Sequence, residues 1–322
     1  MRAPTVDAIH DETSGRVHGG APKRHRRSTL SLGGWRSVIW IVPGLALVGV
    51  FVYFPLVQNI YLSFFDWSVF KPVPAFVGIA NYLQMIGDSV FWRSLFNNAA
   101  YAVISLIFQV LGALVLAALV EEFVRKRGRG ILRAIYFIPS AVSITVAGLL
   151  FYFIYQPNTG LLNEMLRVIG LGGWTQAWLG QGSTAIWGII VMSQWQSFGY
   201  TTLLYSVAMQ RIPRELYDAA DIDGIGPIRR IVEITTPLVR EMSTLLVIVT
   251  ISGAFQVFNE VMVMTAGGPN NSSQVLATWL YNSGFINNQF GYAAAIATVI
   301  FVITFGLAVV QLGASRRRRV EW

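Results

Sequence analysis

Six runs of the chain are almost free of charged residues, and polar segments separate them. The runs lie at about 37–62, 95–120, 134–155, 184–208, 242–265 and 292–313. Each is near the roughly 20 residues that an α-helix needs to cross the hydrocarbon core of a bilayer. The pattern therefore predicts an all-α membrane protein with six transmembrane helices, which form one domain over residues 37–315.

Polar, basic segments flank this domain. Residues 1–36 are rich in Arg, Gly and Ser and contain a basic cluster from Lys23 to Arg27. Such a segment buries too little apolar surface to fold, so we expect a disordered cytoplasmic tail. Residues 316–322 are expected to form a second basic cytoplasmic tail. A basic arm can also bind nucleic acid, but holding the start of the first helix in the cytoplasm is the simpler role.

Composition and charge support the membrane interpretation. The chain is 54% hydrophobic and 12% charged, about half the charged fraction of an ordinary soluble domain. Of the 24 Lys and Arg residues, all except Lys71, Arg93 and Arg167 lie before residue 37, in 121–133, in 209–241 or after residue 313. By the positive-inside rule these four segments, and hence both termini, face the cytoplasm. This distribution accounts for the formal charge of +8 without a nucleic-acid partner.

The polar interruption at residues 211–237 separates two of the apolar runs. Pro213 suits the first turn of a helix, and Glu215 and Asp218 follow near the positive end of the helix dipole. Gly224 tolerates the positive φ that often ends a helix, and Pro227 suits the start of another. The segment is predicted to be a short helix, a glycine turn and a second helix outside the lipid. A helix that only lies on the membrane surface is the alternative.

The residues of this interruption also resemble a known sequence. The run Glu215-Leu-Tyr-Asp-Ala-Ala-Asp-Ile-Asp-Gly224, followed by Thr236-Pro237, resembles the EAA loop of permease subunits in bacterial ATP-binding-cassette importers. It is most similar to the carbohydrate branch, which includes maltose, glycerol-phosphate and oligosaccharide permeases. Asp218 stands where the family usually has Glu, and Ile225 replaces a usual Ala.

Segments between the other runs extend the resemblance to about residues 37–315. These segments are 55–64, 76–82, 265–269 and 290–295. They follow one another in the same order as the similar segments of these permeases. The resemblance implies the fold of a type I importer permease, in which the 211–237 loop is a coupling helix that docks into a cleft of an ATPase. It assigns this role to Glu215, Leu216, Tyr217, Asp218, Ala219, Ala220, Asp223 and Gly224. Segment 156–183 is expected to hold a short amphipathic helix on the outer face.

The resemblance also implies an assembly in the bacterial cytoplasmic membrane. We expect a second homologous permease subunit, two ATPase subunits and an extracytoplasmic solute-binding protein as partners, besides the lipid bilayer. The chain itself is expected to bind no cofactor, with ATP and Mg on the partner ATPases. A nucleotide-binding Walker A loop needs Gly immediately before Lys, and the three lysines follow Pro22, Phe70 and Arg125.

The residues of the spans also bear on two other classes of membrane protein, an enzyme and a secondary carrier. An enzyme needs a nucleophile with a base, paired carboxylates or a metal site. The chain has no Cys, and its three His residues all precede residue 26, so we expect no catalytic and no metal site. A secondary, ion-coupled carrier usually places titratable residues within its spans. Glu260 is one such residue, which leaves a carrier open as the alternative but makes no complete relay.

Polar residues within the runs are the candidate substrate contacts. Ser193, Gln196, Ser197 and Tyr200 are spaced to share one face of the fourth helix, with Trp195 beside them. Hydroxyls and amides suit sugar hydroxyl groups, and aromatic rings suit the C–H faces of a sugar. The resemblance implies that aligned positions line a sugar site. The alternative is a contact between helices, with Gln196 bonded to a neighbour.

The fifth run gives a second set of candidates. Gln256, Asn259 and Glu260 are predicted to share a helical face and to bind substrate. The positions aligned with sugar contacts in maltose permeases are instead Thr250, Gly253, Ala254 and Val257. Those relatives have an aromatic ring and amides at the last three positions, so the differences argue against maltose as the substrate. Gln109 and Ser140 are weaker candidates, for which packing is the favoured explanation.

Overall fold

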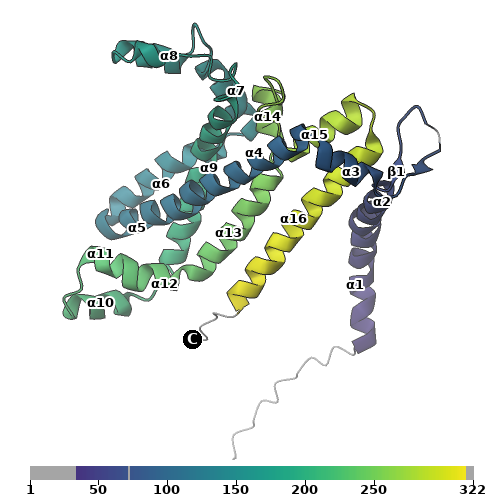
Figure 1. The fold of residues 1–322 in the computed structure, drawn as a ribbon. Helices are drawn as coiled ribbons and strands as arrows, with labels where there is room; N and C mark the ends of the chain where they lie inside the picture. Colours follow the sequence, from purple (N-terminus) through teal and green to yellow (C-terminus); the bar gives the residue numbers. More distant parts are fainter. Residues whose placement is uncertain (1–33, 72, 317–322) are drawn as a thin grey trace, which may run out of the picture. The chain divides into compact units, whose positions relative to one another are not determined.

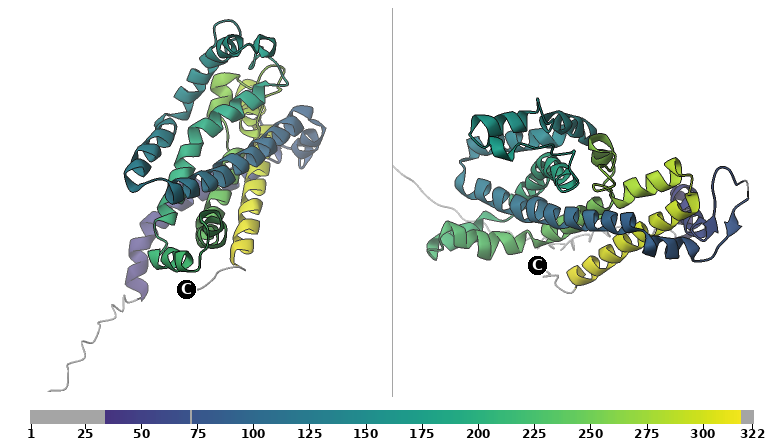
Figure 2. Two further views of the ribbon diagram at one scale, coloured as in Figure 1. Left: turned by 90° about the vertical axis from the view of Figure 1, so that its left-hand side faces the viewer. Right: turned by 45° about the horizontal axis from the view of Figure 1, so that its top comes forward.

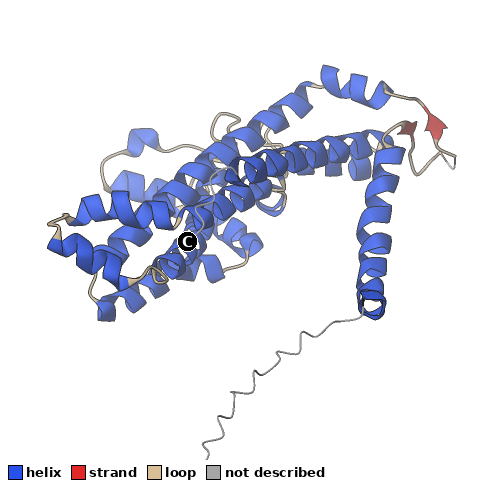
Figure 3. Cartoon of the chain, turned by 90° about the horizontal axis from the view of Figure 1, so that it is seen from below, coloured by secondary structure: helices blue, strands red, loops and turns tan. Residues whose placement is uncertain are grey.

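The structure is a computed structural model that describes residues 34–71 and 73–316. The predicted tails lie outside the described residues, apart from residues 34–36 and 316. The chain divides into two units at Tyr53 and Phe54, and each is described by itself. Helix makes up nearly all of the described chain, and strand is confined to one short hairpin (Figure 3).

The first unit is a single apolar helical segment. Helix α1 covers Gly34–Val48 with Pro43 inside it, and a π-helical turn continues it over Gly49–Tyr53. Large apolar side chains from Trp40 to Tyr53 are exposed. This surface suits a lipid environment, because it would be costly to expose to water.

The second unit begins with the end of that helical run and a small hairpin. Its first elements are α2 (Phe54–Leu62), β1 (Phe65–Asp66), β2 (Ala75–Phe76), α3 (Ala80–Gly87) and α4 (Ser89–Ser105). The strands pair antiparallel, with Phe65 opposite Phe76. Next come a π-helical segment (Leu106–Gly112), α5 (Ala113–Phe123), α6 (Lys126–Ala141), α7 (Ile144–Ile154) and α8 (Leu161–Val168). Helix α8 is the short helix that was expected within 156–183.

The rest of the second unit follows the same pattern. It comprises α9 (Ala185–Met209), α10 (Arg214–Ile222), α11 (Pro227–Arg230), α12 (Thr236–Leu238), α13 (Arg240–Phe255), α14 (Asn259–Met264), α15 (Leu276–Tyr281) and α16 (Phe290–Arg316). A 3₁₀ turn (Gly172–Trp174) and π-helical turns at Ile231–Thr235 and Asn282–Ile286 join some of these. Figures 1 and 2 show α8 and the α10–α11 pair at opposite ends of this unit.

Helix length and hydropathy support a protein that crosses the membrane several times. Among the described residues, three helical segments are long and apolar enough, and they are Trp40–Leu62, Ser89–Phe123 and Phe290–Gly313. Two bent pairs qualify if each is taken as one span, which gives up to five. Helix α9 coincides with the predicted fourth run and has 25 residues, but its polar stripe lowers its hydropathy. The count of six spans stays a prediction.

The structure corrects the expectation that each apolar run is one continuous helix. The run at 134–155 is broken at Val142, where α6 and α7 meet at 89°. Pro139 lies in the last turn of α6, and a proline removes a backbone donor and crowds the preceding turn. The run at 242–265 also divides, because α13 ends at Phe255 and α14 begins at Asn259.

Helix α9 occupies the middle of the packing in the second unit. It packs along α5 and α6, while α13 packs between α4 and α16 (Figure 1). The approach of α9 to α6 is very close at Gly199, where an added Cβ would lie 1.8 Å from the backbone oxygen of Tyr136. Only glycine permits this contact. The large buried side chains around α9 include Ile189, Ile190, Met192 and Tyr205.

Candidate functional sites

The segment 211–237, which we call the coupling loop, has the predicted helix–turn–helix form. Helix α10 ends at Ile222, and Gly224 follows with a φ of +70°. The backbone N–H of Ile225 donates to the carbonyl of Ala220 at 2.9 Å, which closes the helix in the way typical of a glycine C-cap. Pro227 begins α11 as expected. Pro213 is corrected by one position, because it precedes the first helical residue.

The eight predicted coupling residues divide into an exposed and an inward-facing set. The exposed residues are Glu215, Leu216, Asp218, Ala219, Asp223 and Gly224. Ala220 is buried, and the hydroxyls of Tyr217 and Thr235 lie 2.9 Å apart. Burial raises the pKa of the Tyr217 phenol, so this hydroxyl stays neutral and holds α10 against the segment that follows α11.

The loop also exposes apolar side chains that the sequence analysis did not single out. Ile222 is 87% exposed and Ile228 is 70% exposed, and both lie close to the Gly224 turn in sequence. Exposed apolar residues gathered on one short loop are typical of a surface that contacts another protein. Ile222 lies within the recognised run and Ile228 follows it, and the signal that could have found them is an apolar residue in an otherwise polar loop.

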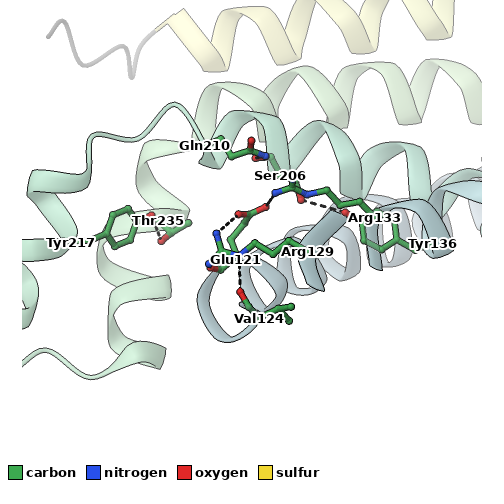
Figure 4. Close-up of polar contacts among 9 residues, drawn as sticks. All are labelled: Glu121, Val124, Arg129, Arg133, Tyr136, Ser206, Gln210, Tyr217 and Thr235. Atoms are coloured by element: carbon green, nitrogen blue, oxygen red, sulfur yellow. Dashed lines mark hydrogen bonds and ion pairs between the residues drawn. The ribbon is translucent and has the colours of Figure 1, made fainter. Parts of the chain in front are cut away.

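Ion pairs fix the coupling loop to the end of α5. Arg230 pairs with Asp221 in α10 and with Glu122 in α5, and the side chains of Arg230 and Glu122 are only 16% and 13% exposed. The adjacent Glu121 pairs with Arg129 and Arg133 of α6 (Figure 4). Arg230 therefore links α10 to the α5–α6 hairpin.

A cavity of about 380 Å³ brings the predicted substrate contacts together. We call it the polar cavity. All seven predicted residues line it, namely Ser193, Gln196, Ser197, Tyr200, Gln256, Asn259 and Glu260. The four positions taken from the maltose permeases, Thr250, Gly253, Ala254 and Val257, also line it, as does Gln109. Ser140 does not appear in this lining.

Gln196 has a structural partner besides its place in the cavity. Its side-chain Nε2 donates to the backbone oxygen of Val142 at 3.0 Å, at the break between α6 and α7. The Ser140 hydroxyl donates in turn to the backbone oxygen of Gln196 at 2.6 Å. The bond from Gln196 pairs a carbonyl that the broken helix leaves free, so the contact between helices foreseen as the alternative is present.

The shared helical face predicted for the fifth run is corrected by the break after Phe255. Gln256 and Asn259 lie on either side of this break and are exposed, whereas Glu260 is buried. One carboxylate oxygen of Glu260 accepts a hydrogen bond from the Tyr101 hydroxyl at 2.8 Å. Tyr101 comes from α4 and was not a predicted site residue, since nothing local in the sequence links it to a partner 159 positions away.

Asn98 stabilises the same break from the opposite side. Its Nδ2 donates to the backbone oxygen of Ala254 at 2.6 Å, and its Oδ1 accepts from the backbone N–H of Leu276 at 2.8 Å. The neighbouring Asn97 donates to the backbone oxygens of Ser272 and Gln274. These two amides hold the cavity wall and the loop before α15 together. Within residues 34–71 and 73–316, no group of acidic and His side chains is arranged to hold a metal.

Comparison with known proteins settles the family. The model of the family described as binding-protein-dependent transport system inner membrane component matches residues 109–320. The chain belongs to this family. The match includes the coupling loop and the α9, α13 and α14 walls of the polar cavity. The chain is therefore a permease of the ABC-transporter type and a multi-pass component of the inner membrane.

Full-length relatives agree with the family match. The probable ABC transporter permease protein YurN of Bacillus subtilis is 47% identical over 274 residues, which is 85% of this chain and 94% of the relative. The diacetylchitobiose uptake system permease protein NgcF of Streptomyces coelicolor is 33% identical over 97% of this chain and 91% of the relative. Similarity thus also covers residues that precede the matched family region.

A solved structure shows the same fold. A bacterial ABC transporter involved in the import of the acidic polysaccharide alginate contains a chain that superposes with a TM-score of 0.78 at 22% identity. The superposition covers 89% of this chain and 97% of that chain. The predicted fold class, an ABC importer permease rich in helices, is confirmed.

Proposed function

We propose that this chain is the permease subunit through which an ABC importer moves a sugar or sugar derivative into the cell. The observation that carries this proposal is the polar cavity, where hydroxyl, amide and aromatic side chains from α4, α9, α13 and α14 converge. This mixture suits a ligand with hydroxyl groups and apolar ring faces. Relatives named for diacetylchitobiose and for lactose support the substrate class.

The partners follow from the same assignment. The chain pairs with a second homologous permease, a solute-binding protein delivers the sugar to the outer face, and two separate ATPase subunits bind and hydrolyse ATP with Mg. The coupling loop docks on an ATPase through its exposed residues, with Glu215, Asp223 and Ile222 in the contact. Both termini lie in the cytoplasm. The alternative of a secondary carrier gains no support from the family or from the relatives.

The ion pairs of Arg230 suggest how ATP binding reaches the cavity. Closure of the ATPases moves α10, and Arg230 passes this movement to α5 through Glu122. Helix α5 packs on α9, which forms one wall of the cavity. Reorientation of these helices switches the cavity between outward and inward access.

Transport by the whole assembly tests the proposal. The permease pair, ATPases and binding protein are reconstituted in vesicles, and uptake of a panel of labelled mono- and disaccharides is measured. We expect uptake of at least one sugar that requires ATP and the binding protein. Uptake driven by an ion gradient without ATP would instead establish a carrier, and failure of the ATPase to co-purify with the permease would overturn the role of the coupling loop.

A further inference from the structure

The polar cavity contains a single ionisable carboxyl group and no basic side chain. Its lining includes Glu260, together with hydroxyl, amide, aromatic and aliphatic residues, and no Lys, Arg or His. The basic residues of α4 and α13 are Arg93, in the second turn of α4, and Arg240, at the start of α13, and neither lines the cavity. This chain therefore contributes one acidic side chain and no basic side chain to the lining of the cavity.

The geometry around Glu260 keeps part of the carboxylate free. The residue is only 7% exposed, and Tyr101, which donates to one of its oxygens, is 3% exposed. No described residue donates to the second oxygen, and this oxygen is not fully buried. A buried carboxylate with one open oxygen can accept a hydrogen bond or a positive charge from a solute.

We propose that Glu260 selects the charge of the transported solute. The cavity admits neutral sugars and sugars that carry an amine, and it excludes those that carry a carboxylate, phosphate or sulfonate group. This inference rests on the proposed function, because it treats the polar cavity as the place where the solute is held during transport.

Electrostatics in a cavity lined by apolar as well as polar side chains supplies the physical reason. A charge interacts much more strongly where water is scarce than in bulk solvent, and this chain contributes no cation to the lining that could offset a second negative charge. An anionic sugar would also lose its own hydration on entry. A protonated amine recovers part of that loss by pairing with Glu260, while a neutral sugar uses the hydroxyl and amide groups of the lining.

The natural absence of cysteine allows the local potential to be measured directly. The chain has no Cys, so Ser197→Cys introduces one thiol on the cavity wall. The assembled transporter is treated with a positively charged and, separately, a negatively charged methanethiosulfonate reagent at pH 7. The labelling rate of this chain is followed by mass spectrometry, and the ratio of the two rates reports the sign of the local potential.

The test compares Glu260 with Glu260→Gln in that background. Gln can still accept the hydrogen bond from Tyr101, so the fold is retained while the charge is removed. We expect the cation-to-anion rate ratio at position 197 to fall about tenfold in Glu260→Gln, as one nearby charge implies. Thr175→Cys, at a half-buried position in the loop between α8 and α9, is the control position, and its ratio should not change.

Transport by the same variants completes the test. Uptake of N-acetylated chitobiose, chitobiose with free amines and a galacturonic acid disaccharide is compared, with the same binding protein throughout so that its own selectivity cancels. Glu260→Gln should raise uptake of the acidic disaccharide relative to the amine, whereas Glu164→Gln on α8 should not. An unchanged rate ratio at position 197 would overturn the inference. Lack of ATP-dependent uptake of any sugar would count against the proposed function. The labelling rates do not depend on transport, so they would still test the charge of the cavity.

Discussion

The coupling loop and the polar cavity differ in the sequence distance that their contacts span. In the coupling loop, Gly224 and Ala220 close a helix within a few residues, and Tyr217 reaches Thr235 only 18 positions away. In the cavity, Tyr101 and Glu260 come from positions 159 apart. Apart from the Arg230–Glu122 pair, which joins positions 108 apart, these contacts within the loop are local, whereas the cavity exists only when several helices have packed. Changes in the loop should therefore affect assembly with partners, and changes in the cavity should mix transport with stability.

Reversal of charge on the coupling loop should have the largest effect. Replacing Glu215 and Asp223 together with Lys places like charges against a surface that we expect to be basic or rich in hydrogen-bond donors, at a cost of several kcal/mol if the contact is desolvated. Pull-downs in detergent should lose the ATPase while membrane insertion is unchanged. Glu164→Lys on α8 is the matched reversal outside the loop. A normal yield of the complex would mean that these carboxylates only solvate the loop.

Removal of Arg230 should break the link between the loop and α5. Arg230→Met leaves the largely buried Glu122 without its partner, which should cost roughly 2–3 kcal/mol, below the range for a fully buried pair. The melting temperature of the purified permease should fall. Arg229→Met is the control, because Arg229 forms an exposed pair with Glu233 of small expected worth. Equal melting temperatures for the two variants would contradict the proposed link.

Two cavity variants separate substrate contact from helix packing. Gln196→Leu leaves the backbone oxygen of Val142 unpaired, which should cost roughly 1–3 kcal/mol of folding free energy. Both the melting temperature and the rate of uptake should therefore fall. Tyr200 is 51% exposed, and Tyr200→Leu should weaken uptake with little change in melting. If both variants transport normally but melt at a lower temperature, the residues serve packing alone.

Loss of the glycine turn should have the smallest thermodynamic cost. Gly224→Val forces a β-branched residue into a positive φ, which costs about 1–2 kcal/mol and should displace α10. Uptake and ATPase docking should drop while the chain remains inserted. Gly226→Val is the control, since Gly226 has a φ of −67° and no atom lies within 4 Å of the position that a Cβ would take. Full ATP-coupled uptake by Gly224→Val would refute the coupling-helix geometry.

The comparison also explains which features the sequence could predict. Pro227, Gly224 and the charged first turn of α10 act on their neighbours, so the loop was predictable almost residue by residue. The stripe on α9 was predictable because its helix is continuous. The break after Phe255 was not, because its free carbonyl is satisfied by Asn98 from a distant helix. Pro139 is a signal in the sequence for the other bend, and the prediction of one continuous helix over 134–155 did not take it into account.

Asn98 has a consequence for the redesign of specificity. One amide group bonds both the last turn of α13 and the first residue of α15, so the two segments share a single anchor. In a chimaera that takes α13 and α14 from another permease, this wall of the cavity will fit the residue that the other permease has at the position of Asn98. Exchange of that wall should succeed only when α4 is exchanged with it, which makes the unit of recombination a set of three helices rather than a contiguous stretch of gene.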